Sequence, residues 1–191
     1  MKKVIFLAVG LALILALLTS CAGKEVIKKD VIKKEDMPGG LRDRSWDAPK
    51  TIQSKEILRF ECEFSFNERQ EEGYFYFIAE IEAGEQTALC RMTGYDGFTE
   101  TLALEFEAPL DALKDLQALA EQHQLAGYNG IDRHTNGLPD RYGSRLLVDY
   151  ASGERIYAYD NSMRFIDHRA QRAIHDRFWE LASESGALIS P

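Results

Sequence analysis

The side chains best suited to chemistry in this chain of 191 residues lie in one polar stretch, residues 128–143. Asp132 and His134 are separated by a single residue, and Asp140 follows a few positions later. A carboxylate beside an imidazole can orient it for general acid–base catalysis, so these side chains have the chemistry of a hydrolase. No nucleophile pattern accompanies them, because Gly-x-Ser-x-Gly does not occur in the sequence.

The length of this stretch also favours a role in binding, because long connections without regular structure are often functional. The same residue types favour turns, so three interpretations stay open: a catalytic loop, a surface for a ligand or partner, and a plain connection. We predict no catalytic residue. The candidate residues for a ligand or partner surface are Tyr128, Asn129, Asp132, His134, Asp140 and Tyr142.

The histidines do not predict a metal site. His168 and His175 lie seven positions apart in a segment with helical periodicity, which separates them by about 10 Å along the helix axis. One zinc ion cannot bind both, because zinc–nitrogen bonds are about 2 Å long. The His-Glu-x-x-His pattern does not occur either. We therefore expect neither a metal nor a cofactor.

Tyrosines in segments with strand periodicity form a second candidate surface. On an exposed face of a sheet, their rings would make a row that suits a partner or a sugar. Packing of the same rings against a covering helix is the alternative, and both interpretations stay open. The residues concerned are Tyr74, Tyr76, Tyr150, Tyr157 and Tyr159.

The N-terminal residues carry a targeting pattern. Lysines at positions 2 and 3 precede an apolar run, residues 4–18, which has the form of a secretory signal. A membrane-spanning helix needs about 20 apolar residues, so this run is too short to be one. The run ends in Leu-Thr-Ser-Cys at residues 18–21, which resembles the lipobox of bacterial lipoproteins. The resemblance implies a signal peptide over residues 1–20 and a Cys21 that carries diacylglycerol and a fatty acyl chain such as palmitate. It also implies an anchor in the cell membrane or outer membrane, with the domain outside the cytoplasm.

Charge and composition narrow the choice of partners. Without Lys2 and Lys3 the chain has 21 basic and 31 acidic side chains, a net charge of −10. Such a surface repels phosphate backbones, so we expect no nucleic-acid partner. For residues 21–54 we predict the lipidated Cys followed by a flexible tether. Lysine pairs alternate there with acidic residues, and Pro38-Gly39-Gly40 breaks regular structure.

The remaining residues, 55–191, predict one globular domain with an α+β fold. Helical periodicity begins at Pro109, which we expect to open a helix, and ends at Gly127. It returns between Asp167, which we expect to be the N-cap of a last helix, and Ser185. The order is ββββαββα, and its short links predict a mainly antiparallel sheet with the helices on one face. Apolar and polar residues alternate, as in strands with one buried face, in residues 58–66, 74–81, 87–93, 99–106, 146–150 and 156–159.

Strand order decides whether Cys62 and Cys90 bond to each other. Neither has a second Cys or His two to four residues away, so they do not predict a zinc site. If the first four strands lie in chain order, the two Cα atoms are about 9–10 Å apart, beyond the reach of a disulfide. We therefore favour two buried free thiols. A disulfide, which requires the first and third strands to be neighbours, is the alternative.

The second half of the chain resembles an uncharacterised family of bacterial secreted proteins and lipoproteins. The family pattern is a Leu-rich helix, a Trp-x-Gly-like triplet, a strand pair and a terminal helix. Here Tyr128-Asn129-Gly130 stands at the triplet, with Tyr in place of Trp, and the Asp-Gly pair that opens the family's strand pair is missing. The resemblance implies a fold and an envelope setting, and it carries no catalytic residue. The matching strand-pair residues are Leu146, Val148, Tyr150, Gly153, Ile156 and Ala158.

These patterns together predict a membrane-anchored lipoprotein of the bacterial cell envelope. We expect its α+β domain to be a non-enzymatic binding or interaction module, with a partner in the envelope or outside the cell. A lipid-anchored hydrolase that uses the loop 128–143 is the alternative. A third interpretation is an inhibitor that presents the same loop to another enzyme.

Overall fold

The computed structural model of the chain describes residues 43–138 and 142–189. The predicted signal peptide, Cys21 and the predicted tether as far as residue 42 lie outside these residues, as does Asp140. The signal, the lipidation and the anchor therefore stay predictions.

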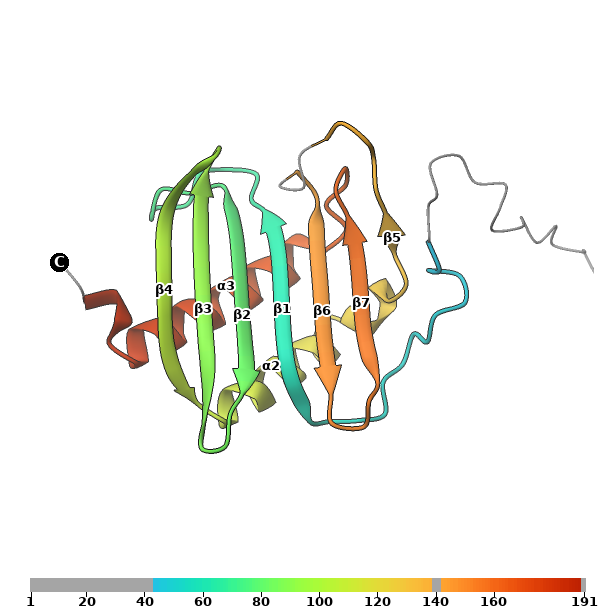
Figure 1. Ribbon diagram of the computed structural model, residues 1–191, viewed down its shortest axis with the longest axis horizontal. Helices are drawn as coiled ribbons and strands as arrows, with labels where there is room; N and C mark the ends of the chain where they lie inside the picture. The colour runs from blue at the N-terminus through green and yellow to red at the C-terminus, as the bar shows by residue number, and fades with distance from the viewer. Residues whose placement is uncertain (1–42, 139–141, 190–191) are drawn as a thin grey trace, which may run out of the picture. The chain divides into compact units, whose positions relative to one another are not determined.

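A single sheet forms the framework of the described part (Figure 1). Its strands lie in the order β4-β3-β2-β1-β6-β7-β5, and neighbours are antiparallel except β5 and β7, which are parallel. The central strand, β1, joins a four-strand meander to the hairpin of β6 and β7. The strands are β1 (Ile57–Ser65), β2 (Tyr76–Ala83), β3 (Thr87–Asp96), β4 (Thr99–Pro109), β5 (Asp132–Arg133), β6 (Ser144–Tyr150) and β7 (Arg155–Asp160).

The helices α2 (Asp111–Gln122) and α3 (His168–Glu184) cover the same face of the sheet (Figure 1). Each buries one apolar stripe, centred on Leu116 in α2 and on Phe178 in α3. Burial of such stripes drives the docking of helices on a sheet. The predicted α+β class, with helices on one face, is confirmed. Short 3-10 turns, η2 (Leu125–Tyr128) and η4 (Ala187–Ile189), follow the two helices.

The predicted order ββββαββα is wrong in one element. The short strand β5 lies between η2 and β6, and its parallel pairing with β7 makes the sheet mixed. The pairing includes a hydrogen bond in which the Tyr159 N–H donates to the Ile131 carbonyl at 2.8 Å. Two residues carry no measurable alternation of apolar and polar side chains, so no sequence pattern indicates such a strand.

The alternation predicted for the first strand is confirmed in its centre and wrong at its start. Cys62 and the two phenylalanines that flank it on the same face are fully buried. Leu58, predicted on that face, is 41% exposed, and Ile57 is buried in its place. The pairing of β1 with β6 shifts register between Ile57 and Arg59, and a shift of one residue exchanges the two faces of a strand.

Two helix boundaries differ from the prediction, and one cap agrees with it. Pro109, predicted to open the first helix, is the last residue of β4. This helix ends at Gln122 rather than at Gly127, and Gln124 takes the left-handed conformation (φ 52°) that glycine usually supplies. Asp167 caps the last helix as predicted, because its carboxylate accepts a hydrogen bond of 2.9 Å from the backbone N–H two residues later.

Cys62 in β1 and Cys90 in β3 are free thiols, so the favoured prediction is confirmed and the disulfide alternative is wrong. The reason is the strand order, because β2 lies between the two strands that carry the cysteines. Burial raises the pKa of the Cys62 thiol, and it raises that of Cys90 to about 12. Both thiols therefore stay protonated near neutral pH.

Residues 43–54, predicted as the end of the tether, contact the folded domain. The Arg44 N–H donates to the Gly130 carbonyl at 2.7 Å, and the Asp43 carboxylate pairs with Arg133 at 2.6 Å. Gly130 permits this approach, because its φ is +87° and a Cβ there would lie 2.6 Å from the Arg44 carbonyl oxygen. Residues 43–54 are therefore attached to the domain, ahead of the predicted start at residue 55, and that boundary stays a prediction. The partners of this segment lie far along the chain and leave no local pattern.

Candidate functional site

Two of the predicted surface residues, Tyr128 and Asn129, hold the fold together. Asn129 is buried, its side-chain N–H donates to the Pro49 carbonyl at 3.0 Å, and its side-chain oxygen accepts from the Tyr157 N–H at 2.9 Å. The Tyr128 ring packs on Phe165, and its hydroxyl accepts a hydrogen bond from the backbone at the start of α3. Both side chains join segments of the fold, so neither is part of an open surface.

Asp132 and His134 lie at the β5 edge of the sheet and do not form an acid–base pair. No hydrogen bond or ion pair joins them in the part of the chain that the structure describes. The His134 ring instead stacks on Tyr159, with the centroids 6.4 Å apart and the planes 16° from parallel. Burial, followed by the charge of Asp132, raises the pKa of Tyr157.

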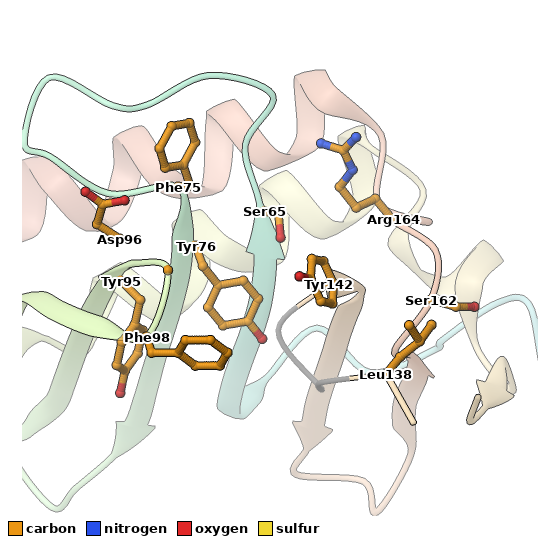
Figure 2. A pocket seen from close by; sticks show the side chains of 11 residues that line it. Ser65, Phe75, Tyr76, Tyr95, Asp96, Phe98, Leu138, Tyr142, Ser162 and Arg164 are labelled. Atoms are coloured by element: carbon orange, nitrogen blue, oxygen red, sulfur yellow. The ribbon is translucent and has the colours of Figure 1, made fainter. Parts of the chain in front are cut away.

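Tyr142 lines a pocket of about 860 Å³ at the end of the sheet where β1 ends and β2 begins (Figure 2). This volume lies in the range of small-molecule sites, about 300–1,000 Å³, which are mostly apolar with a few polar groups. The pocket gathers side chains from strand ends, from a turn and from both sides of the 139–141 segment. We define the aromatic pocket by the rings and aliphatic side chain that line it: Phe75, Tyr76, Tyr95, Phe98, Leu138 and Tyr142.

The sheet places the two tyrosines at the floor of the aromatic pocket side by side. Tyr76 and Tyr95 are direct partners in the β2–β3 ladder, and their ring centroids lie 6.4 Å apart. The Tyr76 hydroxyl donates to Glu63 at 2.7 Å, and the Tyr95 hydroxyl donates to Glu100 at 3.4 Å. These bonds hold both rings in place and use the proton of each hydroxyl.

Phe98 reaches the pocket from the tight turn between β3 and β4. Gly97 precedes it with a φ of +62°, and Asp96 pairs with Thr99 across the turn. The Phe98 side chain is 83% exposed, and Tyr142 is 62% exposed. Because burial of apolar surface stabilises a fold by about 25 cal/mol per Å², two large rings left exposed at one place mark a candidate interaction surface.

Side chains of opposite charge stand at the border of the aromatic pocket. Asp96 pairs with Arg69 at 2.9 Å, and the Arg164 guanidinium donates to the side-chain oxygen of Asn67. Ser162 adds a hydroxyl beside them. The border thus offers hydrogen-bond donors and acceptors together, and its acidic and basic lining residues balance.

A separate polar group lies in the core beneath α3. His175 is 4% exposed and shares a hydrogen bond of 2.6 Å with the Tyr74 hydroxyl, while its other ring nitrogen lies 3.1 Å from Asp176. Burial raises the pKa of Tyr74 well above its ordinary value, so the phenol stays protonated. Tyr74 has no exposed surface. The pair therefore joins α3 to the segment that leads into β2.

The predicted row of tyrosines is divided between the two faces of the sheet. Tyr74 and Tyr150 pack in the core beneath the helices. Tyr76, Tyr157 and Tyr159 lie on the outer face, which we define as the face turned away from α2 and α3. Only Tyr76 among the five also lines the aromatic pocket.

Comparison of the chain with protein families, with curated proteins and with solved structures found no match. Within residues 43–138 and 142–189, none of the helices combines the length and apolar character needed to cross a bilayer. No group of three or more His, Cys, Asp or Glu side chains in these same ranges is arranged to hold a metal ion. The function of the site has to be inferred from its own geometry.

Sequence reasoning found one side of the aromatic pocket and missed the other. Tyr142 was among the predicted surface residues, whereas Phe75, Tyr95 and Phe98 were not. Phe98 had a usable signal, because it directly follows Asp-Gly in a hairpin turn, where polar residues and glycine are the usual choice. The other two rings had none, because their positions depend on where the strands end.

Proposed function

We propose that the chain is a lipid-anchored protein of the bacterial cell envelope whose α+β domain acts as a non-enzymatic binding module. The ligand binds in the aromatic pocket. The lipid on Cys21 keeps the domain at the cell membrane or outer membrane, outside the cytoplasm. The partner is a component of the envelope or of the exterior, and a net charge of −10 after loss of Lys2 and Lys3 argues against nucleic acid.

One observation carries this proposal: Phe98 and Tyr142 expose 83% and 62% of their side chains at the same pocket, although they come from distant segments. A folded domain gains stability when it buries rings of this size. Exposure of both at one place therefore supports a surface that a ligand covers. The two fixed tyrosines beneath them supply a rigid floor, which favours tight recognition because little has to be ordered on binding.

Binding fits the described geometry better than hydrolysis does. The hydrolase alternative requires Asp132 and His134 to act together, but the imidazole stacks on Tyr159 and neither residue lines the aromatic pocket. The hydroxyl beside His175 belongs to Tyr74, whose raised pKa opposes its ionisation. Nothing in this arrangement supplies an activated nucleophile among the described residues.

Retention on envelope material tests the binding function. The full-length protein, kept in detergent, is mixed with insoluble envelope material of the cell that makes it, and the bound fraction is measured after sedimentation. We expect Phe98→Ala combined with Tyr142→Ala to weaken retention at least about tenfold, because loss of two rings at a contact removes more than about 1.4 kcal/mol.

Trp46→Ala is the matched control, because Trp46 is also a large exposed ring, at 73%, and does not line the aromatic pocket. We expect this variant to bind as the parent does. Circular dichroism checks that the double variant keeps its fold, which is expected because both rings are exposed. Equal retention of the parent and the folded double variant would contradict the proposed function.

A further inference from the structure

We propose that the ligand of the aromatic pocket is a saccharide whose rings carry vicinal hydroxyls. The inference rests on the proposed function, because it names the class of ligand that the same pocket binds. A pyranose ring carries C–H groups on its flat faces and hydroxyls around its edge, so it needs an aromatic surface with polar groups beside it. The aromatic pocket and its border offer both (Figure 2).

The exposed rings supply the flat surface. Phe98 and Tyr142 stand at the mouth of the pocket, and Tyr76 and Tyr95 form its floor. The face of an aromatic ring carries partial negative charge, which attracts the polarised C–H groups of a sugar face. The floor rings are fixed by the strand ladder and by their hydroxyl bonds, so binding costs little side-chain entropy there.

The border supplies partners for the sugar hydroxyls. Figure 2 shows Asp96 on one side of the aromatic rings and Arg164 on the other, with Ser162 beside Leu138. A carboxylate accepts hydrogen bonds and a guanidinium donates them. The Ser162 hydroxyl donates its proton to the Asp160 carboxylate at 2.8 Å, so it offers the ligand an acceptor. Hydroxyls along the edge of one sugar chain can therefore satisfy both charged groups, and hydrogen bonds to charged groups are the stronger kind.

The charges around the pocket disfavour an anionic ligand. The lining carries one acidic and one basic side chain, Asp96 and Arg164. Beyond the lining, an anionic ligand would approach a chain that has 31 acidic and 21 basic side chains after loss of Lys2 and Lys3. The Glu100 carboxylate, which accepts from the floor residue Tyr95, adds to this repulsion. Hydroxyl groups carry no charge, so a neutral saccharide meets no such repulsion.

A proline-rich peptide is another ligand with flat apolar rings, and the floor of the pocket disfavours it. Peptides of this kind dock on aromatic grooves, and their backbone carbonyls can only accept hydrogen bonds. Tyr76 and Tyr95 each have a single hydroxyl proton, which is already donated to Glu63 or Glu100. The floor thus offers ring faces and acceptors, which suit a ligand whose own hydroxyls donate.

Selective destruction of sugars in the envelope material tests this inference. Periodate cleaves vicinal diols and so opens the sugar rings that carry them, whereas proteinase K removes protein. Separate portions of the insoluble material receive one treatment, are quenched and washed, and are then mixed with the full-length protein in detergent. We expect periodate to lower retention at least about tenfold, to the level of the Phe98→Ala, Tyr142→Ala double variant, and we expect proteinase K to leave it unchanged.

Substitutions at the border separate hydrogen bonding from stacking. We expect Asp96→Asn and Arg164→Gln each to weaken retention several-fold on untreated material, because each removes a charged partner of a hydroxyl. Neither change alters the aromatic rings. Material treated with periodate should bind the parent and both variants equally weakly.

The outcomes separate this inference from the proposed function. Retention that survives periodate and is lost after proteinase K would identify a peptide ligand and overturn the saccharide, while the binding function would stand. Retention that survives both treatments would also overturn the saccharide. Equal retention of the parent and the Phe98→Ala, Tyr142→Ala double variant on untreated material would overturn the proposed function itself.

Discussion

At the scale of the residue, polar side chains in the core are satisfied by one another. Tyr74 and His175 form one such pair, with the rings of Phe66, Phe77 and Trp179 around the imidazole. A buried polar atom without a partner costs about 1–3 kcal/mol, so neither member of the pair is stable there alone. The hydrogen bond of the pair joins the segment just before β2 to α3, and it fixes how the helix lies on the sheet.

Removal of the Tyr74 hydroxyl oxygen tests how much this pair contributes to stability. We expect Tyr74→Phe to lower the free energy of unfolding by about 1–3 kcal/mol, because the ring keeps its packing while a buried nitrogen of His175 loses its partner. Urea denaturation measures the change. Tyr142→Phe, on an exposed ring, is the control and should leave stability unchanged. An unchanged midpoint for Tyr74→Phe would show that the hydroxyl contributes nothing net.

The buried thiols make a prediction about pH. Burial raises the pKa of Cys90 to about 12, so the native state keeps a proton that the unfolded chain releases near the ordinary value of 9.0. The stability that the protonated Cys90 contributes is fully present when the pH is below that ordinary value, and it is lost as the pH rises toward about 12. We expect the urea concentration at the unfolding midpoint to fall as the pH rises across this range. In the Cys90→Ala variant we expect this midpoint to fall less steeply. A parallel pH dependence in both proteins would rule out this contribution.

At the scale of the element, the segment 43–54 is attached to the sheet by side chains from the opposite end of the chain. Asn129 bonds both Pro49 and the backbone of β7, and the Glu154 carboxylate accepts from the Gln53 and Ser54 N–H groups at 2.9 Å. These contacts extend the domain beyond its periodic elements. Residues 43–54 are therefore attached to the domain.

Asn129 is the side chain on which that attachment depends. We expect Asn129→Ala to speed hydrogen exchange and proteolysis in residues 44–50, and to destabilise the domain by about 1–3 kcal/mol, because the Tyr157 N–H is left buried without its acceptor. Asn136→Ala, at an exposed position of the following loop, is the matched control. Equal exchange of residues 44–50 in both variants would mean that other contacts hold the segment.

At the scale of the whole molecule, the proposed function needs two separate features, an anchor at Cys21 and a binding pocket on the domain. The aromatic pocket gathers residues from the ends of β1, β2 and β3 and from the loop before β6. In a protein free in solution, its exposed rings would favour association between copies of the protein. A ligand that covers the rings prevents this association. The anchor and the pocket are independent, so each can be lost without the other.

The anchor is tested by the chemistry of a single thiol. We expect mass spectrometry of the native protein to find a chain that begins at a lipid-modified Cys21, with residues 1–20 absent. Cys21→Ser should abolish incorporation of labelled palmitate, because the hydroxyl does not replace the thiolate in thioether formation. Cys62→Ala is the control and should keep the label, since Cys62 is buried in the domain. An intact Met1 in the native protein would contradict the lipoprotein assignment.

Features that depend on neighbours along the chain could be predicted before the structure was known. Alternation of apolar and polar residues identified the meander and the hairpin of β6 and β7, and helical spacing identified α2 and α3. Asp167 was recognisable as a cap because its partner is two residues away. The free thiols of Cys62 and Cys90 followed from the chain order of three strands. In each case the interaction partners are close in sequence, so their pattern is periodic and readable.

Features that depend on distant segments could be found only in the folded chain. The strand β5 forms because the chain passes beside β7, and Leu58 is exposed because a register shift exchanges the faces of β1. The aromatic pocket brings Phe98, from a turn, to Tyr142, from a loop more than 40 positions later. Such contacts join residues that share no periodic spacing. The physical reason is that the position of a strand end is set by its pairing partners, and those partners are chosen by the packing of the whole sheet.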